Sequence, residues 1–148
     1  MKIIIGLGNP EEKYSDTRHN VGFEIISKLR RVWNFLDFEF NKKFNAEISK
    51  GTLEGKEIIL VKSQTFVNLS GETIAKILEF YKMTPDEIIV IHDDLDIALG
   101  KFKIATDSSS AGHNGVQNII EKMGTQKFKR VRIGIQPVEL ISIDPSDF

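Results

Sequence analysis

The three histidines of this chain each stand beside a short polar residue, which suggests acid–base chemistry. They occur in the runs Thr17-Arg18-His19-Asn20, His92-Asp93-Asp94 and Gly112-His113-Asn114-Gly115. A histidine can act as a general base near neutral pH, an aspartate can orient it, and amides can hold a substrate carbonyl. These residue types predict a hydrolase that works without a metal ion.

Each histidine lies where we expect one strand, turn or helix to end and the next to begin. Functional residues of α/β proteins often occupy such positions. Residues 3–5 and 88–91 are continuous β-branched or apolar runs, typical of strands buried on both faces. Further strands are expected over residues 44–52, 57–63, 101–104 and 131–135, and helices over residues 19–32, from Ser70 and after Gly115. The first two of these strands would form a hairpin around Glu54-Gly55. The alternation predicts an α/β fold, a three-layer α/β/α sandwich around a twisted mixed sheet, in one domain spanning residues 1–148.

Composition narrows the class of protein. The formal net charge is −1, so a nucleic-acid partner must be held by a local basic patch. Cysteine is absent, which excludes disulfides, thiol nucleophiles and thiolate metal sites. The apolar runs are too short for a signal peptide or a membrane span, so we expect a cytoplasmic protein with no membrane partner. We also expect that the protein uses no cofactor.

Two glycine-containing segments match phosphate-binding motifs only in part. After Gly6-Leu7-Gly8, a dinucleotide fingerprint needs a third glycine where the chain has Glu11. The segment of residues 51–56 is too short for a phosphate loop, and Glu57 stands where a hydroxyl residue is needed, so a hairpin turn is favoured. The sequence also lacks a Gly-x-Ser-x-Gly elbow and a His-x-x-x-His zinc pair.

Five sequence blocks, in order, carry a resemblance to a known family. They are Gly6-Leu7-Gly8-Asn9-Pro10 with Thr17-Arg18-His19-Asn20-Val21-Gly22, Thr65-Phe66-Val67-Asn68-Leu69-Ser70-Gly71, His92-Asp93-Asp94-Leu95-Asp96, Gly112-His113-Asn114-Gly115 and Arg130-Val131-Arg132-Ile133-Gly134-Ile135. From residue 1 to about 135, the chain closely resembles the bacterial-type peptidyl-tRNA hydrolases. The resemblance implies the phosphorylase/hydrolase-like form of the sandwich and hydrolysis of the ester between a peptide and tRNA.

The resemblance also implies roles for individual residues. It makes His19 the general base for water and Asp93 the acceptor that orients this base. It places five side chains against the substrate: Asn9, Tyr14, Asn68, His113 and Asn114, the last of which would also support the oxyanion. Without the resemblance, His19 would fit a surface or capping histidine, and an asparagine at a turn more often caps local backbone. His92, at the end of a buried strand, is expected to be structural.

Basic residues gather in the last third of the sequence. Lys101 and Lys103 alternate around an apolar residue, and so do Arg130 and Arg132, so two adjacent strands would present a basic stripe on one face. By resemblance, Lys103 and Arg132 clamp the terminal phosphate of the tRNA, and Lys101 extends this stripe. Without the resemblance, such a charge run more often forms a solvated surface.

Two segments depart from the family pattern. The loop of residues 106–111 is serine-rich where many relatives are glycine-rich, which should alter its mobility more than the chemistry. After the last strand, we expect a shortened C-terminus without the family's lid and terminal helix, which leaves an apolar patch exposed. We therefore expect a monomer that is able to self-associate through this patch.

Two other functions compete with hydrolysis of peptidyl-tRNA. A catalytically silent RNA-binding module of the same fold would need only the basic stripe, so the presence of His19, Asp93 and the three asparagines disfavours it. A metal-free esterase for small esters would not need the basic stripe. Peptidyl-tRNA is therefore the expected substrate and partner.

Overall fold

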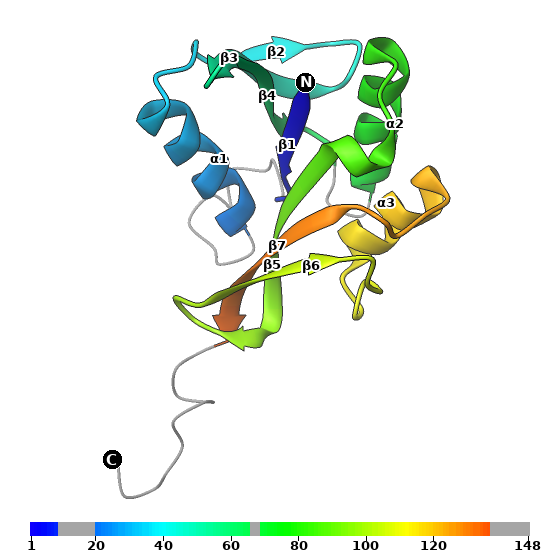
Figure 1. Cartoon of the computed structure of the whole chain (residues 1–148). Helices are drawn as coiled ribbons and strands as arrows, with labels where there is room; N and C mark the ends of the chain where they lie inside the picture. Colours follow the sequence, from blue (N-terminus) through cyan, green and yellow to red (C-terminus); the bar gives the residue numbers. More distant parts are fainter. Residues whose placement is uncertain (9–19, 66–68, 137–148) are drawn as a thin grey trace, which may run out of the picture.

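The described part of the chain folds around one seven-stranded sheet (Figure 1). The structure is a computed structural model that describes residues 1–8, 20–65 and 69–136. Its elements are β1 (Lys2–Gly6), α1 (Val21–Val32), β2 (Glu39–Asn41), β3 (Ala46–Leu53), β4 (Lys56–Ser63), α2 (Ser70–Tyr81), η4 (Pro85–Glu87), β5 (Ile88–Ala98), β6 (Phe102–Thr106), α3 (Asn114–Met123) and β7 (Lys129–Gln136).

The sheet is mixed, as predicted. Its strands lie in the order β2-β3-β4-β1-β5-β7-β6. β1 is parallel to β4 and β5, and β5 is parallel to β7, whereas the remaining pairs are antiparallel. Because β1 has a neighbour on each side and helices over both faces, Ile3 and Ile5 are buried and the strand is continuously apolar.

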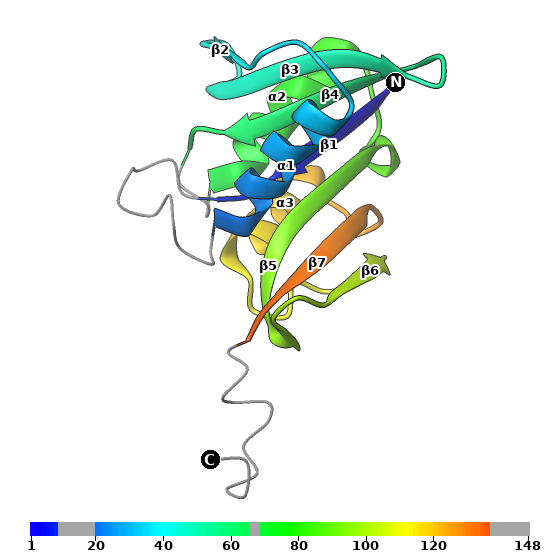
Figure 2. The same ribbon diagram turned by 90° about the vertical axis from the view of Figure 1, so that its left-hand side faces the viewer.

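Helices cover both faces of the sheet (Figures 1 and 2). α1 packs on β1, β4 and β5, over a core that includes Ile26 and Leu60. α2 and α3 lie together on the other face, over a core that includes Ile74 and Ile119. The predicted three-layer α/β/α arrangement is therefore confirmed. In the described part of the chain, no helix has the length and apolar character needed to cross a membrane.

The start of α1 lies very close to the sheet because glycines meet at the contact. A Cβ on Gly22 would lie 2.7 Å from the carbonyl oxygen of Ile91 and 2.8 Å from the backbone nitrogen of Leu7. A Cβ on Gly6 would in turn collide with the backbone of Gly22. Backbone therefore packs on backbone here, and the first turn of α1 is held against β1 and β5.

β3 and β4 form the predicted hairpin. Leu53 pairs with Lys56, and the two residues between them, Glu54 and Gly55, have φ angles of 51° and 79°. Two consecutive positive φ angles are typical of a type I′ turn, whose twist matches that of the strands. The segment that partly matches a phosphate loop is therefore strand and turn.

Several boundaries differ from those that we predicted. β5 does not end at His92 but continues to Ala98, because it keeps pairing with β7 across a register shift after Asp94. β6 begins one residue later than predicted, and α3 begins at Asn114. The short edge strand β2 was not predicted; it pairs with the first residues of β3.

The edge strand β6 exposes apolar side chains. Phe102 and Ile104 are 64% and 61% exposed, and their partners across the strand pair are Ile133 and Val131. We call these four residues the β6 apolar face. Ile133 and Val131 pack against the core beneath α1, so the β6 apolar face lies on the α1 side, where β7 and β6 extend beyond this helix (Figure 2).

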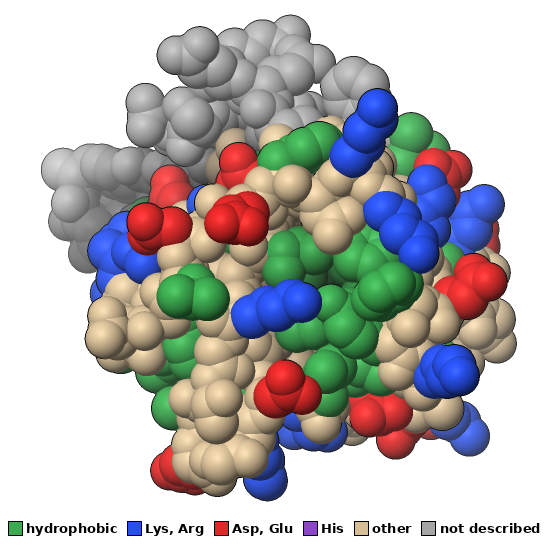
Figure 3. Space-filling view, turned by 90° about the horizontal axis from the view of Figure 1, so that it is seen from above, with side chains coloured by type: hydrophobic (Ala, Val, Ile, Leu, Met, Phe, Trp, Pro, Cys, Tyr) green, Lys and Arg blue, Asp and Glu red, His purple; other side chains and the backbone are tan. Residues whose placement is uncertain are grey.

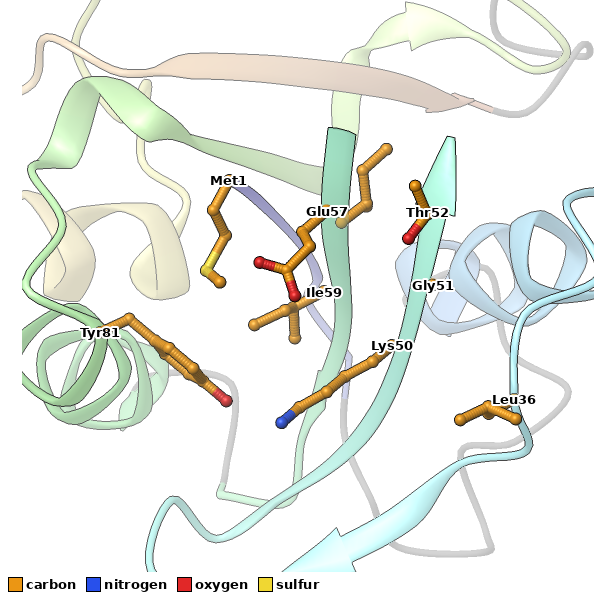
Figure 4. A pocket seen from close by; sticks show the side chains of 9 residues that line it. Met1, Leu36, Lys50, Gly51, Thr52, Glu57, Ile59 and Tyr81 are labelled. Atoms are coloured by element: carbon orange, nitrogen blue, oxygen red, sulfur yellow. The ribbon is translucent and has the colours of Figure 1, made fainter. Parts of the chain in front are cut away.

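A cavity of about 250 Å³ opens at the amino end of β1. Hydrophobic side chains gather on the face seen from this end (Figure 3), and the residues that line the cavity include Met1, Leu36, Lys50, Glu57 and Tyr81 (Figure 4). None of the predicted site residues in the described ranges lines it. The chemistry is therefore sought at the opposite end of the parallel strands.

Candidate active site

The candidate site lies where the parallel strands β1, β4 and β5 end, since ligands of open α/β sheets usually bind outside these ends. Four of the predicted site residues, Asn9, Tyr14, His19 and Asn68, lie outside the described residues. The described part of the site consists of Asp93, His113 and Asn114, together with the cations of β6 and β7.

Asp93 lies on β5, and only 8% of its surface is exposed. Its Oδ1 accepts a hydrogen bond from Nε2 of His113 at 2.8 Å. We did not predict this pair from the sequence, because the resemblance pairs Asp93 with His19. The structure thus brings together two predicted site residues that lie 20 positions apart in the chain.

His113 is the N-cap of α3, and this position fixes the state of its ring. Nδ1 accepts a hydrogen bond from the backbone N–H of Val116 at 3.2 Å. A nitrogen that accepts carries no proton, so the proton is assigned to Nε2, which donates it to Asp93.

His92 is buried, as expected of a structural histidine, with 1% of its surface exposed. Its Nδ1 donates to the carbonyl oxygen of Asp93 at 2.8 Å, and its ring meets that of His113 edge to face, with centroids 4.8 Å apart. Burial, assisted by His113, lowers the pKa of His92 to about 4, so it is neutral at physiological pH.

Asn114 is the first residue of α3, and its side chain is exposed. Ala111 and Gly112 before it have φ angles of 49° and 85°, and the N–H of His113 donates to the carbonyl oxygen of Ser110 at 3.0 Å. This tight turn lets the chain enter α3 with Asn114 at the helix N-terminus, where an amide and backbone N–H groups can hold a developing negative charge.

The predicted phosphate-binding cations lie on adjacent strands. Lys103 of β6 pairs directly with Arg132 of β7, and Lys101 is exposed just before β6. Nε of Arg132 donates to Oδ2 of Asp94 at 2.7 Å, which orients the guanidinium. Burial acts to raise the pKa of Asp94, but the hydrogen bonds from Arg132 and from the N–H of Asp96 outweigh it and lower the pKa.

Arg130 does not join the exposed basic stripe, and this part of the prediction is wrong. It shares a face with Arg132, but it is only 3% exposed because the loop before α3 covers it. Its Nη1 donates to the carbonyl oxygens of Ser108 and Ser109 at 3.0 and 2.8 Å. Burial, followed by repulsion from Arg132, lowers its pKa. Arg130 therefore holds the loop that leads to His113. The alternation of residues along a strand predicts which face Arg130 lies on, but it does not predict that a loop covers this face.

Asn118 was also missed, because a mid-helix asparagine has no local signature. Its Oδ1 accepts a hydrogen bond from the N–H of Gly71 at 2.7 Å, which joins the middle of α3 to the start of α2. A Cβ on Gly71 would lie 2.6 Å from the carbonyl oxygen of Asn118. The two helices are therefore in close contact just after Asn68 in the sequence.

Within the described ranges, no three metal-ligating side chains gather in one place.

Comparison with known proteins gives a consistent result. A sequence model of the family described as peptidyl-tRNA hydrolase matches residues 3–145. The chain is 48% identical to a peptidyl-tRNA hydrolase of Brevibacillus brevis, with 94% of this chain and 72% of the relative covered. It is 44% identical to that of Bacillus subtilis, with 91% and 71% covered. The crystal structure of peptidyl-tRNA hydrolase from Acinetobacter baumannii matches with a TM-score of 0.87 at 33% identity, covering 93% of this chain and 69% of that chain. The chain therefore belongs to the peptidyl-tRNA hydrolase family.

Proposed function

We propose that this protein hydrolyses the ester that joins a peptide to tRNA in peptidyl-tRNA, which releases tRNA from aborted translation. The ester is already activated, so attack by water requires a modest base and a polarised carbonyl. A histidine with its usual pKa is such a base. No metal ion or covalent nucleophile is required for these steps.

In this proposal His19 removes a proton from water, and Asp93 orients His19 and stabilises its protonated form. His19 directly precedes Asn20 and α1 in the sequence. The close contact of Gly22 with Leu7 and Ile91 supports a base near Asp93, because it holds the first turn of α1 against β5 two residues before this aspartate.

The substrate contacts are assigned to the amides and one aromatic residue. Asn9, Asn68 and Asn114 offer both donors and acceptors, which suits a peptide backbone whose side chains vary. Asn114 also supports the oxyanion from the start of α3, and Tyr14 is assigned to the substrate by the family resemblance. His113 shares this region, but its ring nitrogens have partners within the protein.

One observation carries the proposal. Lys103 and Arg132 are direct neighbours across β6 and β7, and Arg132 in turn pairs with His92, the residue before Asp93. With strands about 4.8 Å apart, the carboxylate strand and the outermost cation strand lie about 10 Å apart. Lys101 adds a third cation just before β6. A phosphate bound by these cations would therefore place the end of the tRNA beside Asp93.

The decisive experiment measures hydrolysis of an N-blocked aminoacyl-tRNA, with unblocked aminoacyl-tRNA as the control substrate. The wild-type protein should cleave the blocked substrate, and His19→Ala should abolish cleavage while tRNA binding persists. Binding of tRNA without cleavage by the wild type would instead favour the silent RNA-binding module. Cleavage of simple esters but not of the tRNA ester would favour a small-molecule esterase.

The cations that we assign to phosphate binding have their own test. Lys103→Ala or Arg132→Ala should weaken tRNA binding and reduce the slope of log affinity against log salt by about 1 in each variant, because one phosphate is no longer neutralised. Lys127→Ala, which removes an exposed lysine outside the pair, is the control. Equal effects of all three variants would contradict a specific interaction with phosphate.

We further propose that residues 1–148 act as a single domain in the cytoplasm, as a monomer that self-associates at high concentration. The β6 apolar face supports this contact, because large exposed apolar side chains often form interaction surfaces. Sedimentation over a range of concentrations should show reversible association that Phe102→Ser reduces. Unchanged association in that variant would place the contact elsewhere.

A further inference from the structure

Both ring nitrogens of His113 are occupied by the protein itself. Nε2 donates to Oδ1 of Asp93 at 2.8 Å, and Nδ1 accepts from the N–H of Val116 at 3.2 Å. A substrate group could hydrogen-bond to this ring only by displacing one of these partners. The arrangement therefore favours a function that is exerted through Asp93 over direct contact with the substrate.

The ring is also held from the side. His92 packs against it with centroids 4.8 Å apart and ring planes at 68°. His92 is itself anchored, because its Nδ1 donates to the backbone carbonyl of Asp93 at 2.8 Å. Asp93 is thus bound at its carbonyl by one histidine and at its carboxylate by the other, and the two rings touch. We call these three residues the His92–Asp93–His113 cluster.

We propose that His113 is a positioning residue for hydrolysis, which holds the carboxylate of Asp93 in the orientation that the base requires. This inference rests on the proposed function, because it assumes that Asp93 orients His19. A carboxylate with one oxygen held by a fixed donor has less freedom to rotate, so it can present a constant geometry to its partner. α3 supplies the rigidity, since its first turn holds Nδ1 of the same ring.

The two hydrogen bonds of His113 can be separated by substitution. In His113→Asn, the amide oxygen replaces Nδ1 and still caps α3, but no donor reaches Asp93. In His113→Gln, the longer amide places a donor near the position of Nε2, whereas the cap is removed. One variant thus keeps the stabilising interaction, and the other keeps the interaction that we assign to catalysis.

The proposal predicts opposite effects on stability and activity. His113→Asn should melt within about 2 °C of the wild type, whereas its kcat for N-blocked aminoacyl-tRNA should fall by about ten- to a hundredfold with little change in KM. His113→Gln should melt several degrees lower but keep kcat within about threefold of the wild type. A purely structural role would instead make kcat follow the melting temperature.

Two results would overturn the proposal. A raised KM with unchanged kcat in His113→Asn would mean that the ring contacts the substrate. An equal loss of kcat in both variants at a temperature where both are folded would mean that donation to Asp93 is unimportant. The nitrogen chemical shifts of the wild-type ring give a readout that does not depend on activity. A proton on Nδ1 would refute the geometry, whereas a wild type without hydrolysis but with the proton on Nε2 would refute the proposed function alone.

Discussion

The contact between α1 and the sheet should not tolerate a single added methyl group. Gly22→Ala would place a Cβ closest to the carbonyl oxygen of Leu7, and also 2.7 Å from the carbonyl oxygen of Ile91 and 2.8 Å from the backbone nitrogen of Leu7. An ordinary contact needs about 3.5 Å, so the helix start or the strands must move by at least about 0.8 Å. The atoms in the way belong to backbone, which cannot turn aside as a flexible side chain can.

The expected cost follows from two opposing terms. Overpacking of this kind costs up to about 3 kcal/mol, and alanine recovers at most about 1 kcal/mol because it favours helix more than glycine does. The free energy of unfolding should therefore fall by about 2 kcal/mol, which lowers the melting temperature of a domain of this size by about 4–8 °C. Because the proposed base, His19, directly precedes Asn20 and this helix in the sequence, a displacement of nearly 1 Å should also reduce kcat at least tenfold.

Urea denaturation and hydrolysis of N-blocked aminoacyl-tRNA measure the two effects. Lys28→Ala, at an exposed position of the same helix, is the matched control and should leave both nearly unchanged. A Gly22→Ala variant that is as stable as the wild type, or more stable, would refute the argument from close backbone packing. Reduced stability with full kcat would separate the packing from the position of the base.

Three further predictions concern polar groups that are buried or partly buried. The pKa of His92 is lowered from 6.5 to about 4, so the unfolded chain binds a proton at a higher pH than the folded chain does. The free energy of unfolding should therefore be at its full value above about pH 6.5 and fall by about 3 kcal/mol as the pH falls toward 4. Denaturation at pH 7 and pH 4 measures this loss, and His92→Asn should lack it. Arg130→Met leaves the carbonyl groups of Ser108 and Ser109 without their donor, so the free energy of unfolding should fall by about 2 kcal/mol. Hydrogen exchange of the backbone amides in the loop before α3 should become faster. Arg130→Lys should recover part of the lost stability. Asn118→Ala should cost about 1–2 kcal/mol in chemical denaturation because the N–H of Gly71 loses its acceptor, and Asn118→Asp, which keeps one, should cost less.

The fold could be predicted well where local sequence determines it. The apolar runs before Gly6 and His92 indicated buried parallel strands, and Glu54-Gly55 indicated a hairpin turn, because these signals do not depend on distant contacts. The end of β5 could not be predicted, since its continuation to Ala98 depends on pairing with β7, a strand that begins 31 residues after Ala98.

The sequence could indicate candidate site residues but not the contacts that they make. Alternation correctly placed Arg130 and Arg132 on one face, yet a loop that covers only Arg130 decides which of them meets solvent. Similarly, nothing local to His113 indicates that α3 brings it to Asp93. Which groups become partners depends on how elements pack, and only the folded chain shows that.

The position of β1 in the sheet has a consequence for how this protein is made. Among the seven strands of this sheet, the one that is synthesised first is the central one, and its parallel neighbours, β4 and β5, begin at Lys56 and Ile88. At about 5–20 residues per second, about 5–18 s of synthesis separate the end of β1 from the completion of its second neighbour at Ala98. During that interval the nascent chain exposes an unpaired apolar strand, so each new copy has a period in which chaperones can bind it and aggregation competes with folding.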